Sequence, residues 1–486
     1  MSSKDLSELW ERVDQFRREV TKTSPDKLDC AELEGRAQEL ANAVGLELMR
    51  AVLLRADTES PTVEINGEQW GNRRVSKGEY TTLFGDLEIE RSTYQRAGRG
   101  RVGVPVDLRL GIVERRYTPR VTRLIAHATA VMTAQDSASF LKRAGVATVS
   151  SSTVHRMALA MAARYQTMSD QVAARVRDAD PVPVGAVAVQ VALDGVMVPQ
   201  DGEHCGRRGR KTDEPAEPRW RSRYELGPML GPAGTDNGGG RMWHEASVGT
   251  LAFIDAEGFV LKTTYLARMP EPGKATLVDQ LHDELMAVLD ERPDLTLCFA
   301  SDGAKYHWKV LAGMACQLPE EATGDVYFLV DFFHVAEHLA DAARAIAGDD
   351  TPEATVMAAG WRETIRAFPD GGHRVLKSLR YHRDKLTSEA RRDEVQEVIE
   401  YLAAQAREER LGYAEAEQRN LPIGTGITEA AAKTIVGVRM KRAGARYQEH
   451  GGQTVMLFRS AVLSLRFDTL ARELERSYVA DVKDAA

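Results

Sequence analysis

Cysteine and long apolar runs are both scarce in this sequence. Its 486 residues include 4 cysteines, which lie far apart without a CxxC pair, so the spacing of a disulfide framework is missing. No apolar run approaches the roughly 18 residues that span a bilayer. The N-terminal segment is charged and amphipathic where a signal peptide would carry an apolar core. We therefore expect a soluble, cytoplasmic protein with reduced thiols.

Other familiar signals are missing as well. The chain has no internal repeat, and no GxSxG motif marks the nucleophile of an α/β hydrolase. Apolar residues make up 43% and charged residues 28%, a composition that excludes wholesale disorder and fibrous repeats. At roughly 150 residues per domain, this length predicts about three units.

The net charge of −8 argues, taken alone, against a nucleic-acid partner. Phosphate contacts depend on local clusters rather than on the sum, however, and three segments are rich in Arg and Lys. They are 91–123, 207–223 and a late cluster of Lys433, Arg439, Lys441, Arg442 and Arg446. Each cluster is equally consistent with a solvated face that acids elsewhere balance.

The N-terminal third predicts three successive regions. Residues 1–60 have helical periodicity, and 61–118 read as short strands joined by turns. In 119–177, one helix is expected to end near Arg143, with a turn at Gly145 and a new helix capped by Ser150–Ser152. This helix-turn-helix spacing would direct Arg156 and its neighbours Ser151, Ser152 and His155 toward a DNA groove. An ordinary helical pair has the same pattern.

Beyond a proline-containing linker at 178–186, the pattern becomes α/β. Region 187–335 predicts three strands, a helix, a strand, a second helix and a further strand. Region 336–420 is helical throughout, and 421–486 reads as further helices that complete the core. The expected ranges are strands 187–199, 242–255, 258–269, 295–303 and 325–335 and helices 274–291 and 305–316.

Three acids stand out in this second half. Asp194 interrupts a strand of buried type, Asp302 ends another, and Glu429 follows a Gly-Thr-Gly turn at the start of a helix. A carboxylate in a buried strand is costly unless it is paired or binds a metal ion. Taken singly, each also fits a strand-end turn, a helix cap or an acid that compensates the helix dipole. Together, in this order of elements, they match a recurring layout for metal-dependent phosphoryl transfer.

A second constellation lies between Asp302 and Glu429. Asp331 and His334 form an Asp-x-x-His pattern where a strand enters a helix. The simpler interpretation is a capping Asp and a partly buried His. His338 follows one turn later on the same face, but no cysteine lies near in sequence, so a zinc site is the weaker alternative.

Several segments together resemble a known family. They are VALDGVMV, FASDGAKYHW, LVDFFHVAEHL and, most specifically, PIGTGITEAAAKTIVGVRMKRAGARYQEHGG. Their order and spacing are similar to those of bacterial insertion-sequence transposases of the ISKra type, which are related to Mutator-like transposases. The resemblance covers about residues 70–470. It implies an α/β ribonuclease H-like catalytic core with an all-helical insertion, preceded by a helical and small-strand DNA-binding region.

The resemblance also implies roles for individual residues. Asp194, Asp302 and Glu429 would be the catalytic triad that binds two Mg²⁺ ions, with Mn²⁺ as a substitute. Asp331 and His334 would be accessory residues. The expected partners are double-stranded DNA, as terminal inverted repeats and target, and further copies of the chain in a homodimer or higher oligomer. In the bacterial cell the active protein would be associated with the nucleoid. Residues expected to contact DNA are Arg156, Lys433, Arg439, Lys441 and Arg446.

The chain departs from the family pattern in three places. Thr425 stands where relatives often have Ser, and Tyr447 where they often have Trp. The cysteine pair that many relatives carry near 94–101 is missing, which argues against a zinc ribbon there. Two other functions stay open: a domesticated descendant that binds DNA without cutting it, and a stand-alone nuclease on the same core.

Overall fold

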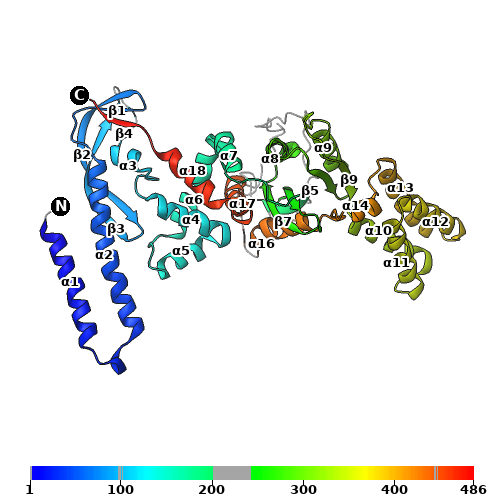
Figure 1. Cartoon of the computed structure of the whole chain (residues 1–486), viewed down its shortest axis with the longest axis horizontal. Coiled ribbons are helices and arrows are strands. Elements are labelled where there is room, and N and C mark those ends of the chain that lie inside the picture. Colours follow the sequence, from blue (N-terminus) through cyan, green and yellow to red (C-terminus); the bar gives the residue numbers. More distant parts are fainter. Residues whose placement is uncertain are drawn as a thin grey trace, which may run out of the picture. The chain divides into compact units, whose positions relative to one another are not determined.

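The computed structural model describes residues 3–96, 100, 102–200, 242–442, 445 and 447–485 (Figure 1). The chain forms two compact units. Unit 1 comprises Met1–Val176 with Phe467–Ala486, and unit 2 comprises Arg177–Arg466. The basic segment 207–223 and the predicted DNA-contacting Arg446 lie outside the described residues.

Unit 1 opens with the helices predicted for its first region. α1 spans Ser3–Lys22 and α2 spans Cys30–Ala56, with a single 3-10 turn, η1 (Pro25–Lys27), between them. The carboxylate of Asp29 caps α2 by accepting hydrogen bonds from the backbone N–H groups of Ala31 and Glu32. The two helices therefore form a hairpin.

A five-stranded antiparallel sheet follows, in the order β10-β1-β2-β3-β4. Leu53 of α2 packs on it beside Tyr80, Leu87 and Ile89. The strands predicted for 61–118 are confirmed up to Gly103, but Pro105–Leu110 forms a helix where strands were expected, and the C-terminal strand that pairs with β1 was not expected. The sheet and the helix beside it comprise β1 (Val63–Ile65), β2 (Glu68–Thr82), β3 (Gly85–Gln95), β4 (Val102–Gly103), β10 (Val482–Asp484) and α3 (Pro105–Leu110).

The predicted helix-turn-helix geometry is present in unit 1. α5 ends at Arg143, and Gly145 makes the turn with a positive φ of 67°. The hydroxyl of Ser150 then caps α6 by accepting a hydrogen bond from the Thr153 N–H at 3.1 Å. The helices of this part are α4 (Pro119–Val131), α5 (Ala134–Arg143), α6 (Ser151–Thr167), α7 (Ser169–Asp178) and α18 (Phe467–Tyr478).

The C-terminal segment departs from its expected place. We expected all of 421–486 to complete the core, but α18 and β10 belong to unit 1. Glu475 of α18 pairs with Arg123 of α4, and Arg164 of α6 donates a hydrogen bond to the Ser477 hydroxyl at 3.0 Å. These contacts connect residues more than 300 positions apart, which periodicity within one helix does not reveal.

Unit 2 contains a second five-stranded sheet in the order β7-β6-β5-β8-β9. β6 is antiparallel to both of its neighbours, β5 and β7, and β8 and β9 run parallel to β5. The predicted succession of strands and helices is observed. The elements are β5 (Ala188–Gln200), β6 (Met242–Ile254), β7 (Val260–Arg268), η2 (Pro272–Lys274), α8 (Ala275–Glu291), β8 (Thr296–Ser301), α9 (Lys305–Ala315), β9 (Val326–Val330) and α10 (Phe332–Ala347).

The helical region predicted for 336–420 is also confirmed, and its core is continuous with that of the sheet. Trp361 and Leu402 belong to the same buried cluster as Phe299 and Leu329 of β8 and β9. The insertion is therefore packed on the core rather than tethered to it. Its helices are α10, α11 (Pro352–Ala367), α12 (Gly371–Lys385), α13 (Glu389–Arg407) and α14 (Tyr413–Gln418).

The segment after the insertion is less regular than expected. The single helix predicted from Ile427 is instead α15 (Gly426–Ala431), a π-helical turn, η3 (Ala432–Gly437), and α16 (Val438–Met440). α17 (Glu449–Leu463) follows, and its Arg459 donates a hydrogen bond to the Thr434 carbonyl at 2.5 Å. The guanidinium of Arg459 thus occupies one of the backbone carbonyls of the π-helical turn η3.

In the part of the chain that the structure describes, no helix combines the length and the apolar character needed to cross a membrane.

Candidate active site

Asp194 and Asp302 lie at equivalent positions on neighbouring parallel strands. β5 pairs with β8 so that Ala192 is opposite Ala300, and the two acids come two positions further along. Parallel strands lie about 4.8 Å apart and their side chains alternate with a period of two. Both acids therefore lie on the same side of the sheet, Asp194 in the middle of β5 and Asp302 directly after the end of β8.

Asp302 is held through both its side chain and its backbone. Its Oδ1 accepts a hydrogen bond from the Ala304 N–H at 3.0 Å, and its carbonyl accepts one from the indole of Trp308 at 2.7 Å. The Trp308 ring is buried and lies 4.2 Å from the guanidinium carbon of Arg410. The position of Asp302 is thus determined by α9 as well as by β8.

A buried series of polar side chains, from Glu245 through Lys274 and His307, leads to the Asp302 carboxylate. Nζ of Lys274 lies 2.8 Å from Nε2 of His307 and 3.2 Å from the carboxylate of Glu245. Because an ammonium group only donates, Nε2 accepts and His307 carries its proton on Nδ1. That nitrogen lies 3.0 Å from the Ser301 hydroxyl and 3.3 Å from Oδ1 of Asp302.

Sequence reasoning missed Lys274 and His307. His307 stands in the quoted segment FASDGAKYHW, five residues after Asp302, so its type and spacing were a usable signal. Lys274 carried no such signal: it lies beyond β7, in the left-handed conformation at φ 48°, and only the fold brings it to α9. Both side chains are buried.

Glu429 reaches the same end of the sheet because its helix is anchored to two strands. The hydroxyls of Thr428 and Thr250, on β6, are 2.7 Å apart. The amide of Gln190, on β5, donates a hydrogen bond to the Gly424 carbonyl at 3.1 Å. Glu429 lies in the first turn of α15, and its Oε1 is 4.0 Å from Nε2 of His334.

Asp331 is fully buried and makes four hydrogen bonds. Its Oδ1 accepts from the N–H groups of Phe333 and His334 at 2.7 and 3.0 Å, which caps α10. Its Oδ2 accepts from the N–H and the hydroxyl of Thr425 at 2.5 and 2.6 Å. The carboxylate thus joins the start of α10 to the turn before Glu429. Of the two residues predicted as accessory, Asp331 has a positioning geometry and His334 lies beside Glu429.

The three acids influence one another electrostatically. Burial raises the pKa of Asp194, and the negative charges of Asp302 and Glu429 raise it further. Burial, the largest single influence, acts to raise the pKa of Asp302, but the hydrogen bond and electrostatic attraction of His307, the Ala304 N–H and His334 together outweigh it and lower that pKa to about 2. The site therefore concentrates negative charge that a cation would relieve.

Tyr401 of α13 brings the helical insertion to this site. Its ring packs against Gly303, where an added Cβ would lie 2.5 Å from a ring carbon. Its hydroxyl is buried without a hydrogen-bond partner among the described residues. Burial raises the pKa of Tyr401 to about 12, and the charges of Asp302 and Asp331 act in the same direction. The ring also lies 4.1 Å from that of His338, which places His338 in an aromatic contact.

The donor chemistry of the site fits a hard divalent cation. None of the described residues donates a hydrogen bond to Oδ2 of Asp194 or of Asp302, and the Glu429 carboxylate faces only His334 and Lys433. Within the described ranges, no three His, Cys, Asp or Glu side chains form a ready-made metal cluster. Mg²⁺ is usually held by one or two carboxylates, with water and substrate phosphate completing the shell, so such a cluster is not required.

The residues expected to contact DNA differ in their surroundings. In unit 1, Arg156 pairs with Glu114 at 3.1 Å on the surface. In unit 2, Lys433 is 78% exposed, one turn after Glu429, and Lys441 is exposed as well. Arg439 is buried, at 5% exposure, so its guanidinium is not presented to solvent.

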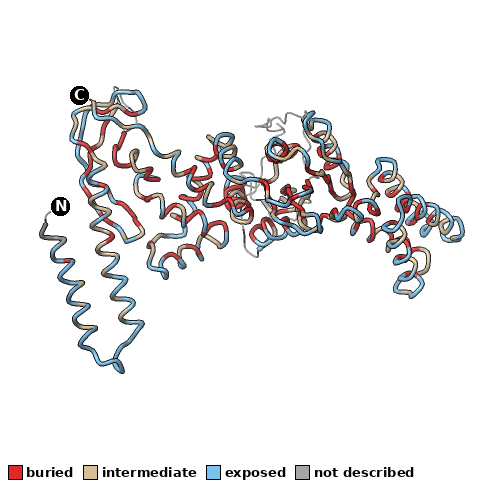
Figure 2. The backbone as a smooth tube through the Cα atoms, viewed as in Figure 1, coloured by how far each residue is buried: buried red, intermediate tan, exposed pale blue. Residues whose placement is uncertain are grey.

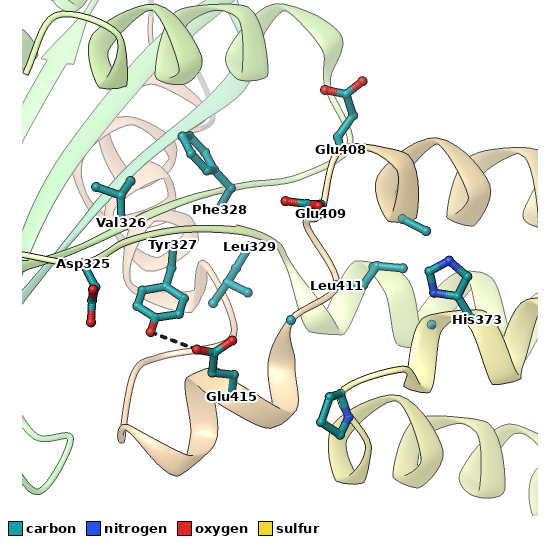
Figure 3. A pocket seen from close by; sticks show the side chains of 14 residues that line it. Asp325, Val326, Tyr327, Phe328, Leu329, His373, Glu408, Glu409, Leu411 and Glu415 are labelled. Carbon is teal, nitrogen blue, oxygen red and sulfur yellow. Dashed lines mark hydrogen bonds between the residues drawn. The ribbon is translucent and has the colours of Figure 1, made fainter.

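A separate hollow of about 690 Å³ lies on the far edge of the sheet, beside β9 (Figure 3). Its wall carries the acids Asp325, Glu408, Glu409 and Glu415, and the Tyr327 hydroxyl donates a hydrogen bond to Glu415 at 3.2 Å. None of the predicted site residues lines it. Its negative charge makes it unsuited to phosphate.

Comparison with protein-family models gives no match, and comparison with curated proteins gives none either.

Proposed function

We propose that this chain is a DNA transposase that cleaves the ends of an insertion sequence and joins them to target DNA by metal-dependent phosphoryl transfer. Its catalytic core would be the sheet of unit 2, as a ribonuclease H-like fold. The strand and helix order, with the helical insertion between β9 and α15, supports this proposal. The resemblance of four sequence segments to ISKra-type transposases supports it independently.

One observation carries the proposal. Asp194, Asp302 and Glu429 come from two strands and a late helix, yet their charges interact at one end of a single sheet. Such convergence is costly because like charges repel. The basic neighbours of these acids are His307 beside Asp302 and His334 and Lys433 beside Glu429, and none of the ion pairs of the described residues includes Asp194. A divalent-ion site explains why the three acids converge.

The residues would divide the chemistry among them. Divalent ions held by Asp194, Asp302 and Glu429 would supply activation of the attacking oxygen and stabilisation of the leaving oxygen. His307 and Lys274 would hold Asp302 in its ionised, oriented state. Asp331 would hold the turn that positions Glu429, and Lys433 and Lys441 would contact the DNA backbone. Positioning and charge neutralisation then carry catalysis, without a covalent protein–DNA intermediate.

The direct test uses a supercoiled plasmid carrying the DNA that flanks the gene in its genome, incubated with Mg²⁺. The wild-type chain is expected to nick it at inverted repeats and to join the ends to target DNA. Asp194→Asn and Glu429→Gln are expected to lower cleavage by more than about 1,000-fold, in the range that removal of essential catalytic groups causes. Binding of the same DNA is expected to survive.

Two exposed acids of unit 2 provide matched controls, Asp290→Asn on α8 and Glu257→Gln on the β6–β7 turn. Loss of folding would not explain the loss of cleavage by Asp194→Asn. Folding raises the pKa of the Asp194 carboxyl, so its ionised form destabilises the native state at neutral pH. The uncharged amide of Asp194→Asn is therefore expected to increase the free energy of unfolding. Wild-type cleavage by either triad variant would overturn the proposal.

The same assay separates the two other functions. Nicking without joined target products would indicate a nuclease. Binding of the flanking DNA with no Mg²⁺-dependent nicking would indicate a domesticated DNA-binding protein.

A further inference from the structure

β9 stands at one edge of the unit 2 sheet, where β8 is its single neighbour among the described strands. The Asp325 carbonyl accepts a hydrogen bond from an N–H of β8, and the Asp331 N–H donates to a carbonyl there. In a parallel pair alternate residues bond to the neighbouring strand, and the residues between them direct their backbone groups away from it. Val326, Phe328 and Val330 therefore present their N–H and C=O groups to the outside of the sheet.

Only the carboxyl end of this edge is paired. The Val330 N–H donates to the Arg410 carbonyl at 3.0 Å, and the Val330 carbonyl accepts a hydrogen bond from the Tyr413 hydroxyl at 2.8 Å. Among the described residues, no hydrogen bond involves the outward backbone groups of Val326 or Phe328. Unpaired groups along an edge strand are a template for a further strand.

The acidic hollow beside this edge has room for such a strand. Its volume of about 690 Å³ lies within the range of roughly 300–1,000 Å³ of ligand sites, and the consecutive residues 325–329 line it. At about 3.3 Å per residue, these span roughly 13 Å, the length of about four extended residues. The rest of the wall includes α12, α13 and α14, each of which has buried residues (Figure 2). The wall is therefore formed before any ligand binds.

Acidic side chains flank the edge on both sides. Glu408 and Glu409 lie on one side of β9, and Asp325 and Glu415 lie on the other (Figure 3). All four are exposed. Among the residues that line the hollow, only His373 can carry a positive charge. A strand added here would thus meet carboxylates with the side chains of both of its faces.

Arginines next to the hollow offset part of this negative charge. Arg410 lies 3.4 Å from Glu408, and Arg419 lies within 4.0 Å of both acids on the other side. Among the described residues, none of the ion pairs includes Glu409. Two guanidinium groups against four carboxylates leave an excess of negative charge, which favours a cationic ligand.

We propose that the β9 edge binds an extended segment of another protein, rich in Lys and Arg, that adds to the sheet as a further strand. Its backbone would pair with Val326 and Phe328, and its cationic side chains would contact the acids on both sides. A polyamine has the charge but no carbonyl groups for the outward N–H groups. The proposal is independent of the proposed function, because Asp194, Asp302 and Glu429 do not line this hollow.

The test measures binding of a labelled peptide to the full chain by fluorescence anisotropy. The probe is Lys-Arg-Val-Arg-Lys, blocked at both ends, and it is expected to bind with a dissociation constant below about 1 mM. The same peptide with two alternate amides N-methylated keeps its charge but loses two donors, so it is expected to bind at least about 10-fold more weakly. Equal binding of the two peptides would overturn strand addition, and so would equal competition by spermine.

Val326→Pro makes the corresponding change on the protein. Proline removes the outward N–H and places its ring against the added strand, while the bonds to β8 persist. Binding of the probe is expected to weaken at least about 10-fold. Val326→Thr keeps both the N–H and the branched side chain, so this control is expected to bind as the wild type does. Circular dichroism compares the folding of all variants. An oligomer of the chain alone that Val326→Pro dissociates would assign the edge to a second copy and overturn the proposal.

Charge reversal gives a test that leaves the strand unchanged. Glu409→Lys with Glu415→Lys is expected to weaken binding of the probe at least about 10-fold. Glu389→Lys with Glu394→Lys, at exposed positions of α13, changes the net charge equally and is expected to leave the affinity unaltered. A wild-type chain that does not bind the probe would overturn the proposal. So would a folded Val326→Pro variant, or a charge-reversed groove, that binds it as tightly as the wild type.

Discussion

At the scale of single residues, His307 has the surroundings of a positioning group. Its Nε2 accepts a hydrogen bond from the Lys274 ammonium, and its Nδ1 proton faces Ser301 and Asp302. Partners of this kind orient a metal-ligating carboxylate, and their loss typically lowers activity or metal affinity by roughly 10–100-fold. We predict such a loss for His307→Ala, measured as cleavage rate and as the Mg²⁺ concentration for half-maximal cleavage.

His307→Asn is expected to recover part of that loss, since its amide can donate in place of Nδ1. His373→Ala, an exposed histidine of α12, is the matched control and is expected to leave both quantities unchanged. Equal activity of His307→Ala and the wild type would show that Asp302 does not need its contact with His307.

Tyr401 is a second residue whose surroundings indicate a role beside the catalytic acids. Its buried hydroxyl has no partner among the described residues, so removing it leaves no group unsatisfied. Tyr401→Phe is therefore expected to unfold at the same or higher denaturant concentration, while cleavage falls roughly 10–100-fold because a polar group that acts electrostatically with Asp302 is lost.

Tyr413→Phe makes the same chemical change with the opposite expectation. The Tyr413 hydroxyl donates a hydrogen bond to the buried Val330 carbonyl at 2.8 Å, so its loss is expected to destabilise by about 1 kcal/mol. If both variants lost stability equally and Tyr401→Phe kept full activity, the Tyr401 hydroxyl would have only a packing role.

At the scale of elements, the Asp331 carboxylate joins α10 to the turn that begins α15. It accepts four hydrogen bonds, two at each oxygen. In Asp331→Asn an NH₂ group would replace one of these oxygens, so two donors would face a further donor. Asp331→Asn is expected to destabilise unit 2 by about 2–4 kcal/mol and to lower cleavage by displacing Glu429. Urea unfolding followed by circular dichroism measures the first effect.

Asp341→Asn on the same helix is the control, since its exposed pair with Arg344 contributes at most about 0.5 kcal/mol. A stable Asp331→Asn variant that fails to cleave would instead assign Asp331 a direct part in the chemistry.

The elements could be predicted from sequence where local pattern decides them. β5 and β8 are runs of apolar and β-branched residues, and α5 and α6 are separated by Gly145 and the cap Ser150. The π-helical turn η3 could not be predicted, because Arg459 of a later helix occupies one of its carbonyls. Pairing of β10 with β1 likewise depends on a contact across the whole chain.

In the candidate site too, local sequence pattern predicts some residues, whereas others depend on tertiary contacts. Asp194, Asp302 and Glu429 could be proposed because an acid in an apolar strand or after a glycine turn is unusual for its local context. Lys274 and Tyr401 could not, since each is ordinary in its own segment and gains its role only from tertiary contacts. Arg439 belongs to a basic cluster in the sequence, but packing buries it, and composition alone does not reveal this.

At the scale of the whole molecule, most of the described arginines of segment 91–123 are paired with acids rather than free. Arg91 pairs with the buried Asp107, and Arg116 pairs with Glu79 and Asp86. Such pairing leaves the net charge of −8 to set the long-range field, which opposes non-specific association with DNA. Among the described residues near the site, the exposed lysines Lys433 and Lys441 are then the candidates for phosphate contacts.

That conclusion makes the salt dependence of DNA binding informative. Each phosphate contact contributes a slope of about 0.9 to the fall of log affinity with log salt. Lys433 and Lys441 are exposed, so the double variant Lys433→Ala with Lys441→Ala is expected to reduce the magnitude of this slope by about 2. Lys377→Ala, an exposed lysine of the helical insertion, is expected to leave it unchanged. Fluorescence anisotropy with labelled flanking DNA over a salt series measures both, and an unaltered slope in the double variant would place the DNA on another surface.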